Sequence, residues 1–191
     1  MSDQPTAGHH DALVPARHVP ARWLTDHVHL LPASGDALDL ACGRGRHALW
    51  LAARGFTVHA VDRDEDAIAS LREEAARQGL EVAARILDLE RPTPVIAASA
   101  YDVIVGVHYL HRPLFPQIVA ALRPGGVLVY ETFTVDQAAI GKPTNPDFLL
   151  RPGELPTLVA PLELCVAREG AYDGRMVASV VARRALSDVT A

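Results

Sequence analysis

Short apolar runs alternate with amphipathic stretches along most of this chain, and this alternation constrains the fold more than any other feature. Helical periodicity marks residues 21–31, 46–54, 64–78 and 113–122. Runs typical of buried strands lie between them, at residues 37–42, 56–61, 82–87, 101–107 and 126–133. Because parallel strands need long crossover connections, usually helices, the alternation predicts a parallel sheet with helices on both faces.

The end of the chain follows a different pattern. Residues 162–168 and 176–184 form two further strand-like runs, and the loop 169–175 between them is too short for a crossover. These two runs therefore predict an antiparallel hairpin. The predicted fold class is α/β: a Rossmann-like doubly wound sheet of five parallel strands plus a C-terminal antiparallel hairpin.

Length and composition limit the organisation and the partners. A chain of 191 residues has room for one domain, predicted at 21–191, after a flexible arm at 1–20 that mixes Pro, His and Gly. The net charge of −5 and the lack of a long uncharged apolar stretch argue against nucleic-acid and membrane partners. Two cysteines and no apolar leader favour a reducing, cytoplasmic compartment. The oligomeric state stays open.

Polar side chains stand where four of the predicted strands end. Asp39, Asp62 and Asp88 close the first three strands and His108 closes the fourth. In open α/β sheets, ligands bind outside the carboxyl ends of the strands. These positions therefore predict the ligand site.

The loop after the first strand contains Gly43 and Gly45, which let the backbone turn tightly and approach a ligand closely. Gly43-x-Gly45-x-x-Ala48 matches the dinucleotide fingerprint, with Asp62 roughly 20 residues further on, so a nicotinamide-dependent oxidoreductase is one interpretation. Asp39 argues against it, because an acid at this place would repel a pyrophosphate. The chain also has scant room for a second mononucleotide-binding half.

Five motifs, in order, resemble those of the class I S-adenosylmethionine (SAM)-dependent methyltransferases. Residues 38–45, LDLACGRG, resemble the first motif, with Ala41 standing where Gly is common. Val61-Asp62 and Asp88-Leu89 resemble the ends of the family's second and third strands. Residues 101–105 and 122–128 resemble its fourth strand and the turn into its fifth. The resemblance runs from about residue 35 to residue 184.

This resemblance implies a domain that binds SAM and transfers its methyl group. Asp39 would favour the ammonium group of SAM, Asp62 would accept hydrogen bonds from the ribose hydroxyls, and Asp88-Leu89 would contact the adenine. Backbone N–H groups at the start of the 46–54 helix would suit the methionine carboxylate. The implied cofactor-binding residues are Asp39, Ala41, Gly43, Gly45, Asp62, Arg63, Asp88, Leu89 and His108.

A narrower resemblance concerns the methyl acceptor. Residues 45–47, 109–113, 130–133 and 141–150 are similar to the tellurite-resistance-type branch of small bacterial methyltransferases. That branch implies a small-molecule acceptor, such as a soft chalcogen or thiol nucleophile. The proline-rich stretch 134–156 is long enough to form a lid over the site. A non-catalytic SAM-binding module is a further alternative.

His108, Arg46 and His111 are the candidate catalytic residues. His108 is placed to contact the acceptor or to act as a general base. Arg46 is placed to orient an anionic acceptor or the SAM carboxylate, and His111 is placed either at the site or as a cap on the helix that follows. No Cys or carboxylate joins the two histidines at ligand spacing, so no metal site is predicted. The motif after the fourth strand also differs from the Asn/Asp-Pro-Pro-Tyr/Phe of base-amine methylating enzymes.

Overall fold

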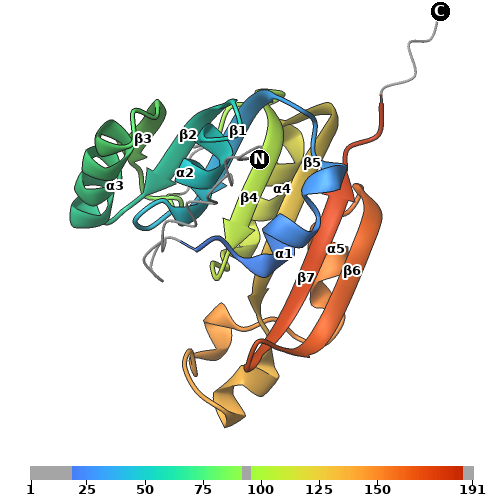
Figure 1. The fold of residues 1–191 in the computed structure, drawn as a ribbon. Coiled ribbons are helices and arrows are strands. Elements are labelled where there is room, and N and C mark those ends of the chain that lie inside the picture. The colour runs from blue at the N-terminus through green and yellow to red at the C-terminus, as the bar shows by residue number, and fades with distance from the viewer. Residues whose placement is uncertain (1–18, 92–95, 187–191) are drawn as a thin grey trace, which may run out of the picture.

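The computed structural model describes residues 19–91 and 96–186, which form one seven-stranded sheet in the order β3-β2-β1-β4-β5-β7-β6 (Figure 1). Five strands run parallel to one another and two form an antiparallel hairpin. Their bounds are β1 Gly35–Leu40, β2 Phe56–Asp62, β3 Val82–Ile86, β4 Tyr101–Val107, β5 Leu122–Phe133, β6 Glu163–Tyr172 and β7 Arg175–Arg183. The predicted sheet with its C-terminal hairpin is confirmed. The predicted arm at 1–20 lies almost wholly outside the described residues.

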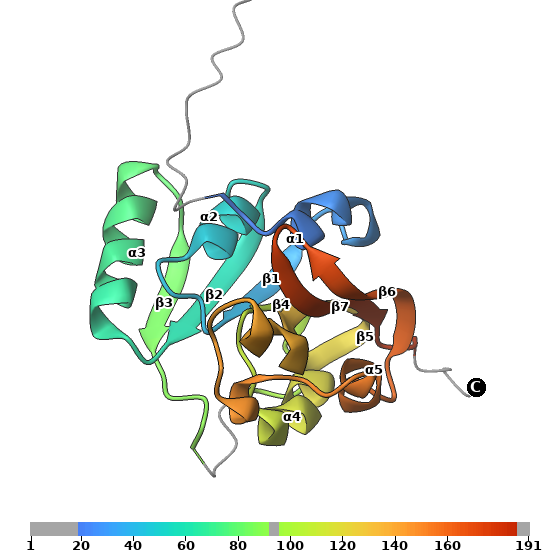
Figure 2. The ribbon, with the colours of Figure 1, turned by 90° about the horizontal axis from the view of Figure 1, so that it is seen from below.

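Helices cover both faces of the sheet, as predicted (Figure 2). One face carries α1 Arg22–Asp26, α2 Arg46–Ala52 and α3 Glu65–Arg77, and the other carries α4 Phe115–Ala121 and α5 Glu154–Leu158. Four 3₁₀ helices complete the fold: η2 Val28–Leu30, η3 Arg112–Leu114, η4 Val135–Ala139 and η5 Pro146–Phe148. None of the helices in the described parts is long and apolar enough to span a bilayer.

Two of the predicted helices are each divided in two, and the helix predicted at 46–54 ends at Ala52. The stretch 21–31 divides into α1 and η2, and it ends with Leu31 extended because a residue before proline disfavours the helical region. The stretch 113–122 divides into η3 and α4, each of which has a proline in its first turn. The helix predicted at 64–78 is confirmed as α3, whose N-cap Asp64 accepts a hydrogen bond from the Ala67 N–H at 3.0 Å.

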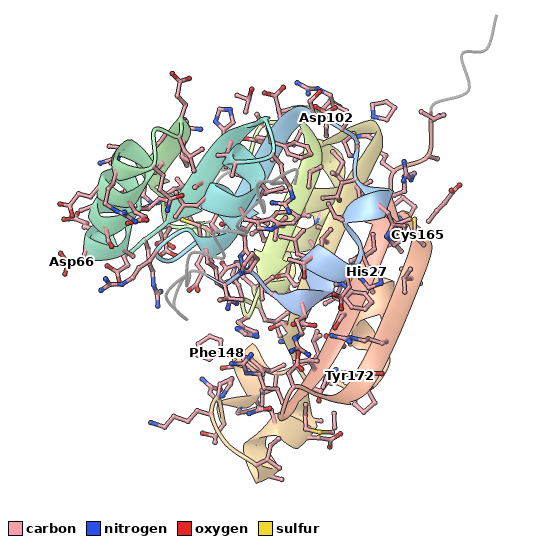
Figure 3. The ribbon with its side chains drawn as sticks, in the orientation of Figure 1. His27, Asp66, Asp102, Phe148, Cys165 and Tyr172 are labelled. Atoms are coloured by element: carbon pink, nitrogen blue, oxygen red, sulfur yellow. The ribbon has the colours of Figure 1, made fainter. Side chains whose placement is uncertain are left out.

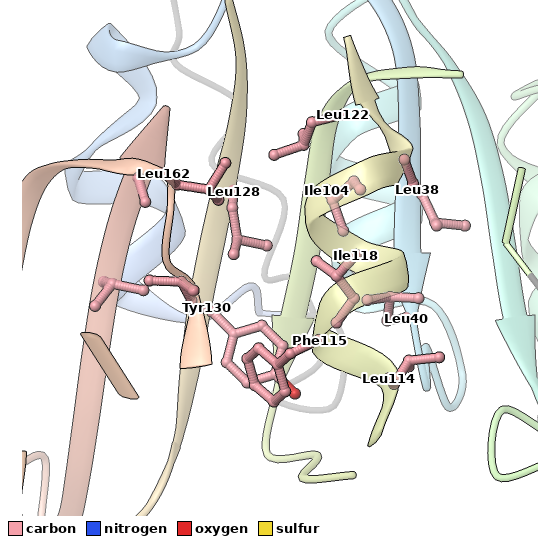
Figure 4. Close-up of a cluster of buried hydrophobic side chains, with 14 of the residues drawn as sticks. Leu38, Leu40, Ile104, Leu114, Phe115, Ile118, Leu122, Leu128, Tyr130 and Leu162 are labelled. Carbon is pink, nitrogen blue, oxygen red and sulfur yellow. The ribbon is translucent and has the colours of Figure 1, made fainter. Parts of the chain in front are cut away.

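The hydrophobic core forms one layer on each face of the sheet. In β4, Val103, Ile104 and Val105 are all 0% exposed, as expected for a parallel strand that is covered on both faces. Beneath α4, the ring of Tyr130 packs on Phe115 with 5.1 Å between ring centroids (Figure 4). The Tyr130 hydroxyl donates a hydrogen bond of 2.7 Å to the carbonyl oxygen of Tyr109, just beyond the end of β4. This core residue thereby holds the backbone that leaves β4.

The hairpin is tighter than predicted. β6 extends to Tyr172 and β7 begins at Arg175, so that Asp173 and Gly174 alone make the turn, with φ of 50° and 71°. Two-residue hairpin turns with positive φ favour Asp-Gly, because their twist matches that of the flanking strands. Since β7 is antiparallel to β5, its first residues lie at the edge of the sheet where the parallel strands end. Residues 134–150 continue beyond β5 at that same edge (Figure 1).

An ion-pair network closes the opposite edge of the sheet. The Arg123 guanidinium lies 2.8 Å from a carboxylate oxygen of Asp36 and 2.5 Å from one of Asp102. Figure 3 labels Asp102 at one end of the molecule and Phe148 toward the other. The Arg123 network is thus remote from the carboxyl edge of the sheet.

Candidate functional site

A pocket of about 230 Å³ opens at the carboxyl edge of the sheet. Its wall is built from the ends of β1, β2, β4 and β5, from the segment after β3, and from the segment after β5. It is lined by Ala41, Asp62, Arg63, Leu87, Asp88, Leu89, Glu90, His108, Tyr109, Leu110, Phe133, Pro143 and Phe148. The structure therefore brings together six of the predicted site residues, which are Ala41, Asp62, Arg63, Asp88, Leu89 and His108.

A second pocket, of about 290 Å³, adjoins the first at Ala41. It contains two more of the predicted residues, Gly43 and Arg46. A Cβ added at Gly43 would meet no atom within 4 Å, so this backbone faces open space that a ligand can enter. Gly45 differs, because a Cβ there would lie 2.2 Å from Leu71 Cδ1. Gly45 lets the loop pack on α3 and does not line either pocket.

Ala41 adopts a backbone conformation that favours glycine. Its φ is 49°, in the left-handed region, which costs an L-residue about 1–2 kcal/mol. Glycine tolerates this conformation better than alanine does, which explains why the family that the chain resembles commonly has glycine at this position. Ala41 lines both pockets.

Asp62 joins the first loop to the end of β2. One of its carboxylate oxygens accepts a hydrogen bond of 2.7 Å from the Gly43 N–H, and the other accepts one of 3.0 Å from the Asp64 N–H. Each carboxylate oxygen can accept more than one hydrogen bond. Asp62 therefore fixes the loop and keeps capacity to accept hydrogen bonds from a ligand in the pocket.

Asp39 lies beneath the loop and is 0% exposed. Its Oδ2 accepts a hydrogen bond of 3.0 Å from the Ala48 N–H of α2, while its Oδ1 is buried and unpaired within the described residues. The Nδ1 of the buried His47 lies 3.6 Å from that oxygen. On its other side, His47 Nε2 accepts a hydrogen bond of 3.3 Å from the Ala21 N–H. The predicted ammonium contact of Asp39 stays a prediction, because the carboxylate lies behind the pocket wall.

His108 is the residue that the structure constrains most strongly. Its backbone has φ of 60° and donates a hydrogen bond of 2.8 Å to the Glu131 carbonyl, while its ring stacks on Phe133 with 4.6 Å between centroids. Burial, with the nearby charges of Arg175 and Arg46, lowers the pKa of His108 to about 4. Its Nε2 is buried and has no partner among the described residues. The imidazole is therefore neutral near pH 7, available for a hydrogen bond and a weak base.

The charges of two arginines act on His108, and sequence reasoning identified only one of these arginines. Burial lowers the pKa of Arg46, and Arg175 lowers it further. Arg175 starts β7 and fell within the predicted hairpin loop, so it was missed. The signal that could have found it is the Asp173-Gly174 pair, since a two-residue turn there starts the next strand at Arg175.

His111 does not share the pocket of His108. It lies in an adjoining hollow of about 270 Å³, with Leu110 and Phe148 between the two spaces. Its side chain makes no cap hydrogen bond to η3. The lid at 134–156 stays a prediction, and two residues of this stretch, Pro143 and Phe148, line the pocket that contains His108.

The donor set of the two pockets suits SAM. Apolar and aromatic walls beside the Asp62 carboxylate match a flat base joined to a sugar with vicinal hydroxyls. Tyr109 and His108 line the pocket, and their Oη and Nε2 atoms are buried and unpaired within the described residues, so each has unused hydrogen-bonding capacity beside the ligand space. The open backbone at Gly43 and the cation of Arg46 match a carboxylate next to an ammonium group. The residues present thus fit the cofactor.

Comparison with known proteins agrees with this geometry. Residues 37–126 match the family described as a methyltransferase domain. The probable SAM-dependent methyltransferase TehB of Haemophilus influenzae is 30% identical over 89 residues, which cover 45% of this chain and 30% of that protein. The ribosomal RNA small subunit methyltransferase C of Alcanivorax borkumensis is 31% identical over 110 residues, which cover 52% and 33%.

Solved structures extend the likeness to most of the fold. The crystal structure of TehB from Haemophilus influenzae matches with a TM-score of 0.71 at 22% identity, over 84% of this chain and 61% of that one. At this identity the match shows the fold alone. The chain spans about a third of the length of the first curated relatives that it matches.

Proposed function

We propose that this protein transfers a methyl group from SAM to a small acceptor. The premise is that residues 37–126 match a methyltransferase domain and that the fold is that of the class I SAM-dependent methyltransferases. The single observation that carries the proposal is the Asp62 carboxylate, which is hydrogen-bonded to the glycine loop and lines a pocket of apolar and aromatic side chains. The same pocket holds Asp88 and Leu89, which the resemblance assigns to the adenine. The compartment we propose is the cytoplasm.

The residues divide between the two pockets. Asp62 accepts hydrogen bonds from the ribose hydroxyls, Leu89 packs on the adenine, and Asp88 accepts a hydrogen bond from it. In the adjoining pocket, Gly43 and Arg46 receive the amino-acid end. The buried Asp39 supports this end from behind the wall, as a negative charge that favours an ammonium group.

The chemistry that SAM supplies is an electrophilic methyl carbon on a positively charged sulfur. The acceptor forms a bond to that carbon while the bond between carbon and sulfur breaks, and the sulfur keeps the electron pair. Much of the rate gain in such a displacement comes from alignment, worth up to roughly 7–11 kcal/mol in favourable cases. Here the stacked pair of His108 and Phe133 is the rigid wall against which an acceptor is aligned.

The surroundings of His108 favour an acceptor that is already a nucleophile at neutral pH. A base with a pKa of about 4 removes a proton from an alcohol or a phenol poorly. A thiolate or another soft, anionic nucleophile needs no such removal, and the charges of Arg46 and Arg175 attract an anion. We therefore propose a small anionic or soft acceptor, with His108 as a hydrogen-bonding and positioning group, and Arg46 as the cation that orients the acceptor or the cofactor carboxylate.

The first experiment is a calorimetric titration of the purified protein with S-adenosylhomocysteine (SAH), the demethylated product. We expect binding at one site per chain. Asp62→Ala should weaken that binding at least tenfold, whereas Asp64→Ala, which removes a neighbouring helix cap that lines neither pocket, should leave it nearly unchanged. An unchanged affinity for Asp62→Ala would refute the site, and no binding to folded wild-type protein would refute the function.

Turnover then separates the remaining alternatives. Thiols, selenite and tellurite are tested by SAH release, with His108→Ala expected to lower turnover more than SAH affinity. Binding of SAH without turnover on any acceptor indicates a SAM-binding module. Methylation of ribosomal RNA in preference to these small acceptors would contradict the proposed acceptor class. Enhanced fluorescence of NAD(P)H on binding, with no SAH binding, would indicate the oxidoreductase.

A further inference from the structure

Arg112 makes the densest set of polar contacts in the described part of the segment that follows β4. Its Nε donates to Glu154 Oε1 at 2.7 Å and its Nη2 donates to Glu154 Oε2 at 2.9 Å, which is a bidentate pair. Its Nη1 donates to the Asp147 carbonyl at 3.0 Å, and Nη2 donates also to the Leu149 carbonyl at 2.8 Å. A bidentate pair between an arginine and a carboxylate stabilises the contact and also fixes the relative orientation of the two side chains.

These contacts connect two parts of the pocket wall. Arg112 begins η3, two residues after Leu110, and Leu110 lines the pocket together with His108 and Tyr109. Its partners Asp147 and Leu149 flank Phe148, which lines the same pocket from the other side. One guanidinium therefore holds the segment after β4 and the segment around η5 at a fixed separation.

The backbone of Phe148 is held within η5 by a hydrogen bond of 3.1 Å from its N–H to the Asn145 carbonyl, but its side chain is poorly packed. Its side chain is 47% exposed, and Figure 3 shows it on the 134–150 segment beyond the end of the sheet. The two residues that follow it are better anchored, since Leu149 is 2% exposed and the Leu150 N–H donates to the Phe133 carbonyl at 2.8 Å. The Glu154 side chain is also held by its own segment, since its Oε2 accepts a hydrogen bond of 2.8 Å from the Arg151 N–H.

We propose that Arg112 is a positioning residue that fastens residues 147–154 to the end of β4 and so keeps Phe148 in place as a wall of the ligand pocket. The pairing is mutual, because the hydrogen bonds from Arg112 lower the pKa of Glu154 and those to Glu154 raise the pKa of Arg112. The pair thus stays charged over the whole range of pH in which the protein would be assayed. The effect on ligand affinity rests on the proposed function, whereas the effect on the segment does not.

The test compares Arg112→Ala, Arg112→Lys and Glu154→Gln with the control Arg123→Ala. Arg123 is a matched control, since it pairs with two carboxylates, its side chain is 38% exposed against 32% for Arg112, and it lies at the opposite edge of the sheet. Backbone hydrogen exchange is followed by mass spectrometry in a peptide that covers residues 144–151, without ligand. We expect at least tenfold faster exchange there in Arg112→Ala, a smaller increase in Arg112→Lys and Glu154→Gln, and no local change in Arg123→Ala.

The second readout is the SAH dissociation constant by calorimetry. We expect Arg112→Ala to raise it about five- to tenfold and Arg123→Ala to leave it within twofold, even where both lower the melting temperature. Unchanged exchange in the 144–151 peptide, or equal local effects of Arg112→Ala and Arg123→Ala, would overturn the proposal. Faster exchange with unchanged SAH affinity would overturn the link between Arg112 and the ligand pocket.

If Arg112→Ala does not fold, Arg112→Lys and Glu154→Gln decide the matter by the same two readouts. If wild-type protein does not bind SAH, the proposed function fails, and hydrogen exchange alone still decides whether Arg112 fastens the segment.

Discussion

A methyl group at position 106 should disturb the core and the pocket together. A Cβ added at Gly106 in β4 would lie 2.4 Å from Cε2 and 2.7 Å from Cδ2 of Tyr130. Tyr130 cannot move aside easily, because it is 0% exposed, packs on Phe115 and hydrogen-bonds the Tyr109 carbonyl. In the close-up of this core, Tyr130 and Phe115 lie against each other beneath α4 (Figure 4).

The cost of Gly106→Ala follows from these contacts. Overpacking of a close-packed core costs about 1–3 kcal/mol, and loss of the Tyr130 hydrogen bond adds roughly 0.5–1.5 kcal/mol. We expect the free energy of unfolding to fall by about 2–4 kcal/mol in total. For a domain of this size, each kcal/mol shifts the melting temperature by roughly 2–4 °C, so we expect a decrease of about 4–16 °C.

Urea unfolding followed by circular dichroism measures this change. Tyr130→Phe, which removes only the hydroxyl, should cost about 1 kcal/mol. Gly106→Ala combined with Tyr130→Leu should be less destabilised than the sum of the two single variants by at least about 1 kcal/mol, because the smaller side chain makes room for the added methyl group. A Gly106→Ala variant within about 0.5 kcal/mol of wild type, or strictly additive effects in the double variant, would refute the reasoning.

Two further predictions concern backbone strain and pH. Ala41→Gly replaces an L-residue whose φ is 49°. It should raise the free energy of unfolding by about 0.5–1 kcal/mol, after the greater freedom of glycine in the unfolded chain is subtracted. Urea unfolding measures this change, and a loss of stability would contradict the prediction. Because the pKa of His108 is about 4 in the folded protein and 6.5 ordinarily, the unfolded chain binds more protons between these values, so stability should fall as the pH drops from 6.5 to 4, by at most about 3 kcal/mol. Unfolding measured between pH 4 and 7 should show a smaller loss in His108→Gln than in wild type, and NMR titration of the His108 ring should give its pKa directly.

The arrangement of the central strands could be predicted from the sequence because these strands are covered on both faces. Such a strand is apolar along its whole length, as Val103, Ile104 and Val105 show, and helices must then lie on either side. α3 was equally predictable, since Asp64 caps its start and a left-handed Gly79 follows its end. The hairpin was recognised, but its turn was placed too broadly because the Asp-Gly signal was not used.

The sequence predicted which residues stand at the strand ends, but not which of their side chains face the pocket. Asp62, Asp88 and His108 meet because parallel strands end at one edge of a sheet. Which face of the sheet a side chain lies on depends on the alternation of side chains along the strand. Asp39 shares a face with Ala37, beneath α2, and its burial follows from that alternation. His111 and Arg112 could not be placed, since their positions depend on where the 134–156 segment returns.

The direction of β7 has a consequence for how this protein can change over evolutionary time. Arg175 acts electrostatically on His108 because an antiparallel strand begins where its parallel neighbours finish, and the turn at Asp173-Gly174 lies at the same edge of the sheet as the site. Arg22 at the start of α1 reaches this turn, with its guanidinium 3.5 Å from the Asp173 carboxylate. Insertions at this hairpin tip would change the surface at this edge of the sheet while every strand keeps its neighbours. Under the proposed function, the range of acceptors could thus diverge here while the strand order is kept.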